Sequence, residues 1–207
     1  MKQGVFKSIL YSGVFATTCV LSLPLKAQTS LINKVNDNQS VLAAQAYHFT
    51  DLLNLAYTPV EDQGRSGTCW SYSTNSFLES EMIKKGKPPV HLSKIFTARQ
   101  VYLEKAENYL RMDGNLNYGD GGQAHDVTNM LAKYGTMPES VYTGLINGAT
   151  SNDFAAMQSE ILGHLKSWVA AGTVPSNWKD SINTVLDKYL GVVPKEFQYK
   201  GKTYTPL

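Results

Sequence analysis

A run with two glycines, Gly64 and Gly67, leads directly into a helical pattern that begins at Cys69. From Cys69 onward apolar residues recur at three- and four-residue steps, and Gly86 with the two prolines behind it ends the pattern. The first turn of a helix carries partial positive charge and unpaired N–H groups, which favour the thiolate form of a cysteine placed there. The run therefore predicts a reachable, ionisable thiol where a helix begins.

The first 27 residues have the three-part pattern of a secretory signal peptide. Lys2 and Lys7 form a basic start, an apolar stretch runs from Ile9 to about Leu25, and Ala27 offers a small residue for cleavage. A transmembrane anchor is the alternative, but the stretch is shorter than the roughly 20 residues that a span needs. We therefore expect a secreted or periplasmic protein that is free of the membrane after cleavage.

Export sharpens the interpretation of the two cysteines, Cys19 and Cys69. Cleavage near Ala27 removes Cys19, and its lipidation is disfavoured because Thr18 is bulkier than the small residue usually found before a lipidated cysteine. A lone thiol in an oxidising compartment cannot be half of an internal disulfide. Cys69 is then either an inert buried side chain or a thiol kept for chemistry, and composition alone leaves both open.

The bulk composition excludes several classes of partner. The 207 residues are 43% hydrophobic and 17% charged, which is ordinary for a globular protein with a buried core. A net charge of +2 is too small to indicate nucleic acid or an anionic membrane. The sequence has neither a Cys/His cluster with ligand spacing nor a phosphate-binding glycine motif, so we expect no metal and no cofactor.

We divide the chain into a signal peptide (1–27), a polar lead-in (28–55) and one domain (56–207). Within that domain, periodicity predicts five helices and one hairpin. The helices are expected from Cys69 to Gly86, from Ser93 to Leu110, from about Gln123 to Tyr134, from Asp153 to Ala171 and from Trp178 to Leu190, and the hairpin from Phe197 to Thr205.

The first of these helices is expected to have one apolar side, made by Trp70, Phe77, Leu78 and Met82. Glu81 stands four residues before Lys85, which is a favourable spacing for an ion pair on a helix surface.

Gln63 stands six residues before Cys69, across the flexible loop. Its side-chain amide and the backbone N–H of Cys69 are the right groups to donate hydrogen bonds to an oxyanion. A nucleophile and two oxyanion donors are thus offered within one short segment. The plainer interpretation is that Gln63 is a surface loop residue and Cys69 a structural thiol, with Asp62 and Arg65 as solvated loop charges.

This segment resembles the active-site segment of the papain-like cysteine peptidases, which place a Gln six residues before the nucleophilic Cys and a Trp directly after it. The usual Cys-Gly-Ser/Ala-Cys-Trp/Tyr pattern is altered here, because Ser66-Gly67-Thr68-Cys69-Trp70 lacks the first cysteine. The run is more similar to the bleomycin hydrolase and aminopeptidase C branch. Asp120-Gly121-Gly122-Gln123 and the later Lys133–Pro138 also resemble that branch.

The resemblance covers Thr58 to Tyr142 strongly and implies an α+β, papain-like fold. The chain would hold mainly the helical nucleophile subdomain, with the β-rich half largely missing. It further implies that Cys69 is the nucleophile and Gln63 the oxyanion donor. Gly121 and Gly122 would bind the backbone of a peptide substrate, with Trp70 as core or cleft wall; alternatively, the two glycines form only a turn before a helix. The branch often forms closed hexamers, so a homo-oligomer is also expected.

The histidines do not complete the family's pattern. The base of papain-like enzymes lies roughly 130–150 residues after the Cys, and no histidine follows Tyr199, where that window opens. His48 and His91 are expected at the surface, His164 in a structural helix, and His125 near the cleft without being the base.

We therefore expect a truncated sequence whose catalytic His and Asn lie further on, and an aminopeptidase-like activity rather than endoproteolysis. The alternative is a catalytically inactive peptide-binding module that uses the same cleft.

Overall fold

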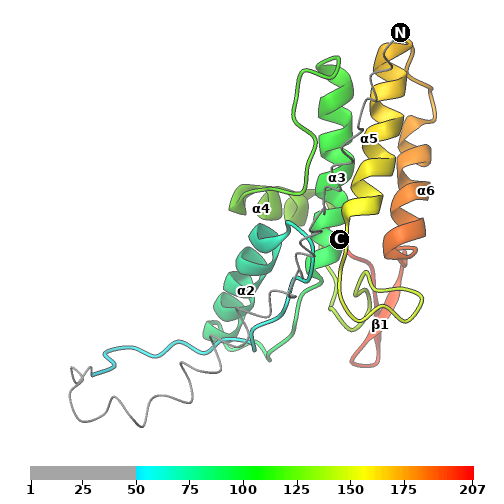
Figure 1. Ribbon diagram of the computed structural model, residues 1–207. Helices are drawn as coiled ribbons and strands as arrows, with labels where there is room; N and C mark the ends of the chain where they lie inside the picture. The colour runs from blue at the N-terminus through cyan, green and yellow to red at the C-terminus, as the bar shows by residue number, and fades with distance from the viewer. Residues whose placement is uncertain (1–49) are drawn as a thin grey trace, which may run out of the picture. The chain divides into compact units, whose positions relative to one another are not determined.

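The structure is a computed structural model that describes residues 50–207 (Figure 1). The chain divides into two units, Met1–Leu52 and Leu53–Leu207, and the elements below all belong to the second. The predicted signal peptide and most of the predicted lead-in lie outside the described residues, so the structure does not test them.

The predicted helices and the hairpin are all present. The helices are α2 (Cys69–Lys84), α3 (Lys94–Arg111), α4 (Ala124–Tyr134), α5 (Ala155–Ala170) and α6 (Trp178–Leu190). Strand β1 (Phe197–Tyr199) pairs antiparallel with β2 (Lys202–Tyr204), with Phe197 opposite Tyr204. Within residues 50–207 this hairpin is the only sheet. The predicted α+β fold, mainly helical with the β-rich half largely absent, is confirmed for the described part of the chain.

The helix ends follow from local chemistry. The Ser93 hydroxyl accepts a hydrogen bond from the Phe96 N–H at 3.0 Å and so caps α3. The Asp126 carboxylate accepts one from the Gln123 N–H at 2.8 Å, just before α4. Gly86 follows α2 with a φ of +74°, a left-handed conformation that ends helices at little cost for glycine.

Helix α3 is the centre of the core, because it contacts α2, α4, α5 and α6 (Figure 1). Figure 1 shows α5 and α6 running side by side along one flank of α3, while α2 and α4 lie nearer its start. The side chains packed between α3, α5 and α6 are apolar and fully buried, and they include Tyr102, Ile161, Leu165, Ile182 and Leu186. None of the helices within residues 50–207 is both long enough and apolar enough to cross a membrane.

The predicted apolar side of α2 is wrong. Trp70 is buried, but Phe77 is 61% exposed, and Leu78 and Met82 are only half-buried. The face of α2 that turns inward carries Trp70, Ser71, Thr74, Asn75 and Glu79. These polar groups are tolerated inside because they are hydrogen-bonded: the Ser71 hydroxyl donates to the Lys94 carbonyl at 2.7 Å. The Glu81–Lys85 pair is also wrong, since Glu81 lies 3.4 Å from the Lys84 ammonium instead.

Candidate active site

Cys69 is the first residue of α2, and its side chain is exposed. Thr68, the residue before it, makes no side-chain hydrogen bond to the first turn, because its hydroxyl lies 2.6 Å from that of Ser66. The first turn of α2 also contains no acidic residue. No side chain of α2 or of Thr68 therefore caps the positive end of the helix, and the thiol sits beside it.

Gln63 lies in a tight turn just before this helix. Its side-chain amide donates to the Ser66 carbonyl at 2.8 Å, and the Ser66 hydroxyl donates back to the Gln63 carbonyl at 2.8 Å. The reciprocal pair holds Gln63 half-buried within the loop. A side-chain amide carries two N–H groups, so one remains for a further acceptor.

The same loop is held against the residues that precede α5. Gly64 has a φ of +65°, and a Cβ added there would lie 2.3 Å from the Ser151 hydroxyl, so only glycine fits. The next residue, Arg65, donates its backbone N–H to the Asn152 carbonyl at 2.7 Å. Both contacts limit how far the turn that carries Gln63 can move.

Asp120 joins the segment before Cys69 to the glycine pair. Its carboxylate accepts the Gly67 N–H at 3.0 Å and the Tyr102 hydroxyl at 3.2 Å. Its backbone carbonyl accepts the Trp70 indole N–H at 2.9 Å. A Cβ added to Gly122 would lie 2.6 Å from the Trp70 ring, so this close approach requires glycine. The structure thus brings Cys69, Trp70 and the glycine pair together at one end of α2.

Two side chains of α3 support this junction and have no signal in the sequence. Burial, reinforced by the Asp120 carboxylate, raises the pKa of Tyr102 above its ordinary value. Lys105 donates to the Gly119 carbonyl at 2.7 Å and also to the Gly121 carbonyl, and burial lowers the pKa of Lys105. Asp120, in contrast, could have been identified from the sequence as a residue of the site, because it directly precedes Gly121 and Gly122.

The described histidines have partners other than Cys69. The His91 side chain is 35% exposed, and its Nδ1 lies 2.7 Å from a Glu61 carboxylate oxygen. His125 is exposed beside Asp126, and His164 stacks on Trp168 within α5. Within residues 50–207 no hydrogen bond or ion pair joins any of these three to Cys69, and His48 lies outside the described residues. Among residues 50–207 no group of His, Cys, Asp and Glu is arranged to hold a metal.

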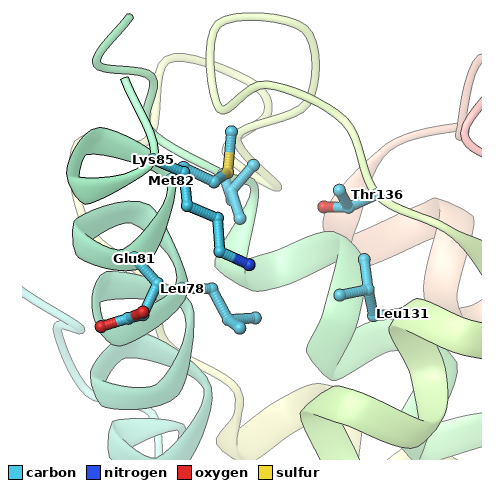
Figure 2. Close-up of a pocket in the computed structure, with 7 residues that line it drawn as sticks. Leu78, Glu81, Met82, Lys85, Leu131 and Thr136 are labelled. Atoms are coloured by element: carbon cyan, nitrogen blue, oxygen red, sulfur yellow. The ribbon is translucent and has the colours of Figure 1, made fainter. Parts of the chain in front are cut away.

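An apolar pocket of about 250 Å³ lies along the second half of α2 (Figure 2). Leu78 faces Leu131 across it, the Lys85 side chain extends from α2 toward Leu131 and Thr136, and the Glu81 carboxylate points away. Leu78 is nine residues beyond Cys69, which is more than 10 Å along a helix that rises about 1.5 Å per residue. The pocket is therefore separate from the candidate active site.

The sequence matches the model of the Peptidase C1-like family over residues 23–200. The chain belongs to that family, which confirms the resemblance to papain-like cysteine peptidases.

Among solved structures, the fold is similar to that of PepW from Lactobacillus rhamnosis HN001, with a TM-score of 0.55 and 18% identity. The match covers 88% of this chain and 50% of that one, so this chain spans half the length of PepW. A comparison with curated proteins finds no match.

Proposed function

We propose that the protein hydrolyses peptide bonds through a thioester formed on Cys69. The observation that carries the proposal is the exposed thiol at an uncapped helix start, beside a loop that holds Gln63. In this mechanism the Cys69 sulfur attacks the peptide carbonyl carbon, the C–N bond breaks and the amine leaves with a proton. Water then hydrolyses the thioester and frees the thiol.

The oxyanion of the tetrahedral intermediate is stabilised in this proposal by the backbone N–H of Cys69 and the free amide N–H of Gln63. Trp70, Gly121 and Gly122 form the adjoining wall that aligns the peptide backbone. Support comes from the junction at Asp120, which holds this wall beside the start of α2. The mechanism also needs an imidazole that accepts the thiol proton and an Asn that orients it.

Alkylation and substitution of Cys69 test the mechanism. In the full-length protein, iodoacetamide should label Cys69 and abolish hydrolysis of short peptides, and Cys69→Ala should lower kcat/KM by at least about 10³-fold. Phe77→Ser is the matched control, because Phe77 is exposed on the same helix two turns away and should leave activity unchanged. Full activity of Cys69→Ala refutes the thioester mechanism. Peptide binding without turnover by the wild type would support the inactive peptide-binding module instead.

We further propose aminopeptidase-like trimming, which rests on the similarity of Asp120–Gln123 and Lys133–Pro138 to the aminopeptidase C branch. A peptide with a free N-terminus should be hydrolysed, and its N-acetylated counterpart should not. Equal cleavage of both, at internal bonds, would show an endopeptidase. The export that the first 27 residues predict is tested separately, by sequencing the N-terminus of the mature protein.

A further inference from the structure

A buried ion cluster lies where α2, the start of α3 and the segment before Gln63 meet. The side chains of Lys94 and Glu79 are each 1% exposed, and the ammonium lies 2.9 Å from a Glu79 oxygen. The same ammonium contacts the carboxylate of Glu61, which is 27% exposed. Lys94 therefore holds one carboxylate from a helix and one from the loop.

Glu79 also contacts the segment before Gln63 directly, through Thr58. One of its oxygens also accepts the Leu92 N–H at 2.7 Å, and the other accepts the Thr58 hydroxyl. The second oxygen of Glu61 lies 2.7 Å from His91. Lys94 thus links Glu61 to α2 and α3, and His91 contacts Glu61 from the segment between the two helices.

Stability alone does not account for a lysine at this position. Lys94 is the first residue of α3, where the helix dipole disfavours a cation. Buried ion pairs are often matched or exceeded in stability by apolar residues of similar volume. Two carboxylates, those of Glu61 and Glu79, contact this buried ammonium. The cluster therefore fits a role in fixing position.

Glu61 precedes Gln63 by two residues, and Gly64 and Arg65 are fixed against residues 151–152 on the other side of it. The turn that carries Gln63 is consequently held at both ends, and Lys94 is one of the groups that hold the end at Glu61.

We propose that Lys94 is a positioning residue for the Gln63 side chain and acts through its ion pair with Glu61. The proposal rests on the proposed function, because Gln63 matters only if it donates to an oxyanion. Lys94 itself does not touch the substrate. Since an oxyanion donor acts on the transition state, misplacing Gln63 should lower kcat and leave KM nearly unchanged.

Kinetics of the full-length protein test this with Lys94→Met, Lys94→Arg and Glu61→Gln. Lys94→Met and Glu61→Gln should each lower kcat about 10–100-fold, and Lys94→Arg, which keeps the charge, should recover most of it. In a Gln63→Ala background Lys94→Met should have little additional effect, because both changes remove the same interaction. Additive losses, or an unchanged kcat, overturn the proposal. Glu81→Gln, which breaks the exposed Glu81–Lys84 pair on α2, is the matched control.

Hydrogen exchange separates this inference from the proposed function, because it does not require turnover. Amides of residues 60–66 should exchange at least about tenfold faster in Lys94→Met and Glu61→Gln, with α5 and α6 unchanged. If the wild type hydrolyses no peptide, the proposed function fails while this measurement still tests the link from Lys94 to the loop. Unchanged exchange at residues 60–66 in a folded variant overturns the link. Should Lys94→Met fail to fold, Glu61→Gln decides, since Glu61 is only half-buried.

Discussion

The two flanks of α3 are built by different kinds of interaction. On one flank α5 and α6 pack through fully buried apolar side chains such as Ile161, Leu165 and Leu186, with the Arg99–Asp187 ion pair at 2.7 Å beside them. On the other flank the inward face of α2 is polar and ends in the Glu79–Lys94 pair. Apolar packing tolerates shifts and volume-conserving changes, whereas hydrogen bonds and ion pairs fix atoms in direction as well as distance. Directional contacts therefore hold the flank that carries Cys69, and apolar packing holds the other.

Removing Glu79 is the most severe test of whether buried ion pairing stabilises the α2 flank. Glu79→Ala leaves Lys94 buried with one fewer carboxylate, and should lower the free energy of unfolding by about 3–5 kcal/mol. The double variant Glu79→Leu/Lys94→Met should regain part of that stability, because no charge is then left unpaired on α2 or α3, although the Leu92 N–H and the Thr58 hydroxyl lose their acceptor. Urea denaturation of the three proteins measures both effects. A loss below about 1 kcal/mol in Glu79→Ala would mean that the pair is not buried as the structure has it.

On the apolar flank, Leu186→Ala should cost about 2–4 kcal/mol, because Leu186 is fully buried between α6 and its neighbours. The rate at which iodoacetamide labels Cys69 in the folded protein should nevertheless stay within about twofold of the wild type. Leu186→Met, which nearly conserves volume, is the control and should cost less than about 1.5 kcal/mol. A large change in labelling rate would show that the two flanks are coupled.

A smaller effect, with a pH dependence, is expected at Glu139. Burial raises the pKa of Glu139 from its ordinary value to about 7, and Lys94 partly opposes the rise. The folded protein therefore holds this proton more tightly than the unfolded chain does. The resulting stability is present below about pH 4.5 and is lost as the pH rises through about 7.

Glu139→Gln should remove this loss and stabilise the protein by about 1–2 kcal/mol at pH 8, after allowance for the partial exposure of the side chain. That corresponds to a rise in Tm of about 2–6 °C at pH 8 and almost none at pH 5. Thermal melting at the two pH values measures the difference, with Glu81→Gln as a surface control. An equal change in Tm at both pH values would assign the effect to packing rather than to charge.

The sequence predicts the apolar flank well and the polar flank poorly, for a physical reason. Apolar spacing and a terminal glycine located α5 and α6 to within two residues, because burying one stripe of side chains determines both helices. In a periodic pattern Glu79 and Lys94 look like surface residues. Their burial becomes possible because they pair with each other, 15 residues apart in the sequence, which offsets the cost of removing both charges from water. Glu61 is likewise indistinguishable from a solvated loop charge until the structure places it on Lys94. Cys69 and Gln63 could be proposed because their spacing is a local feature.

The smallest expected effect tests the corrected face of α2. Phe77 is 61% exposed, so Phe77→Ser removes little buried surface and should change the free energy of unfolding by less than about 0.5 kcal/mol. Asn75→Leu, two residues earlier on the inward face, should cost several times more, because the Asn75 amide donates to the Ser71 carbonyl at 2.9 Å and its site is polar. Urea denaturation of the two variants gives the comparison. If Phe77→Ser were the more damaging, the apolar side that periodicity predicts would be the inward face, and the polar flank would not exist as described.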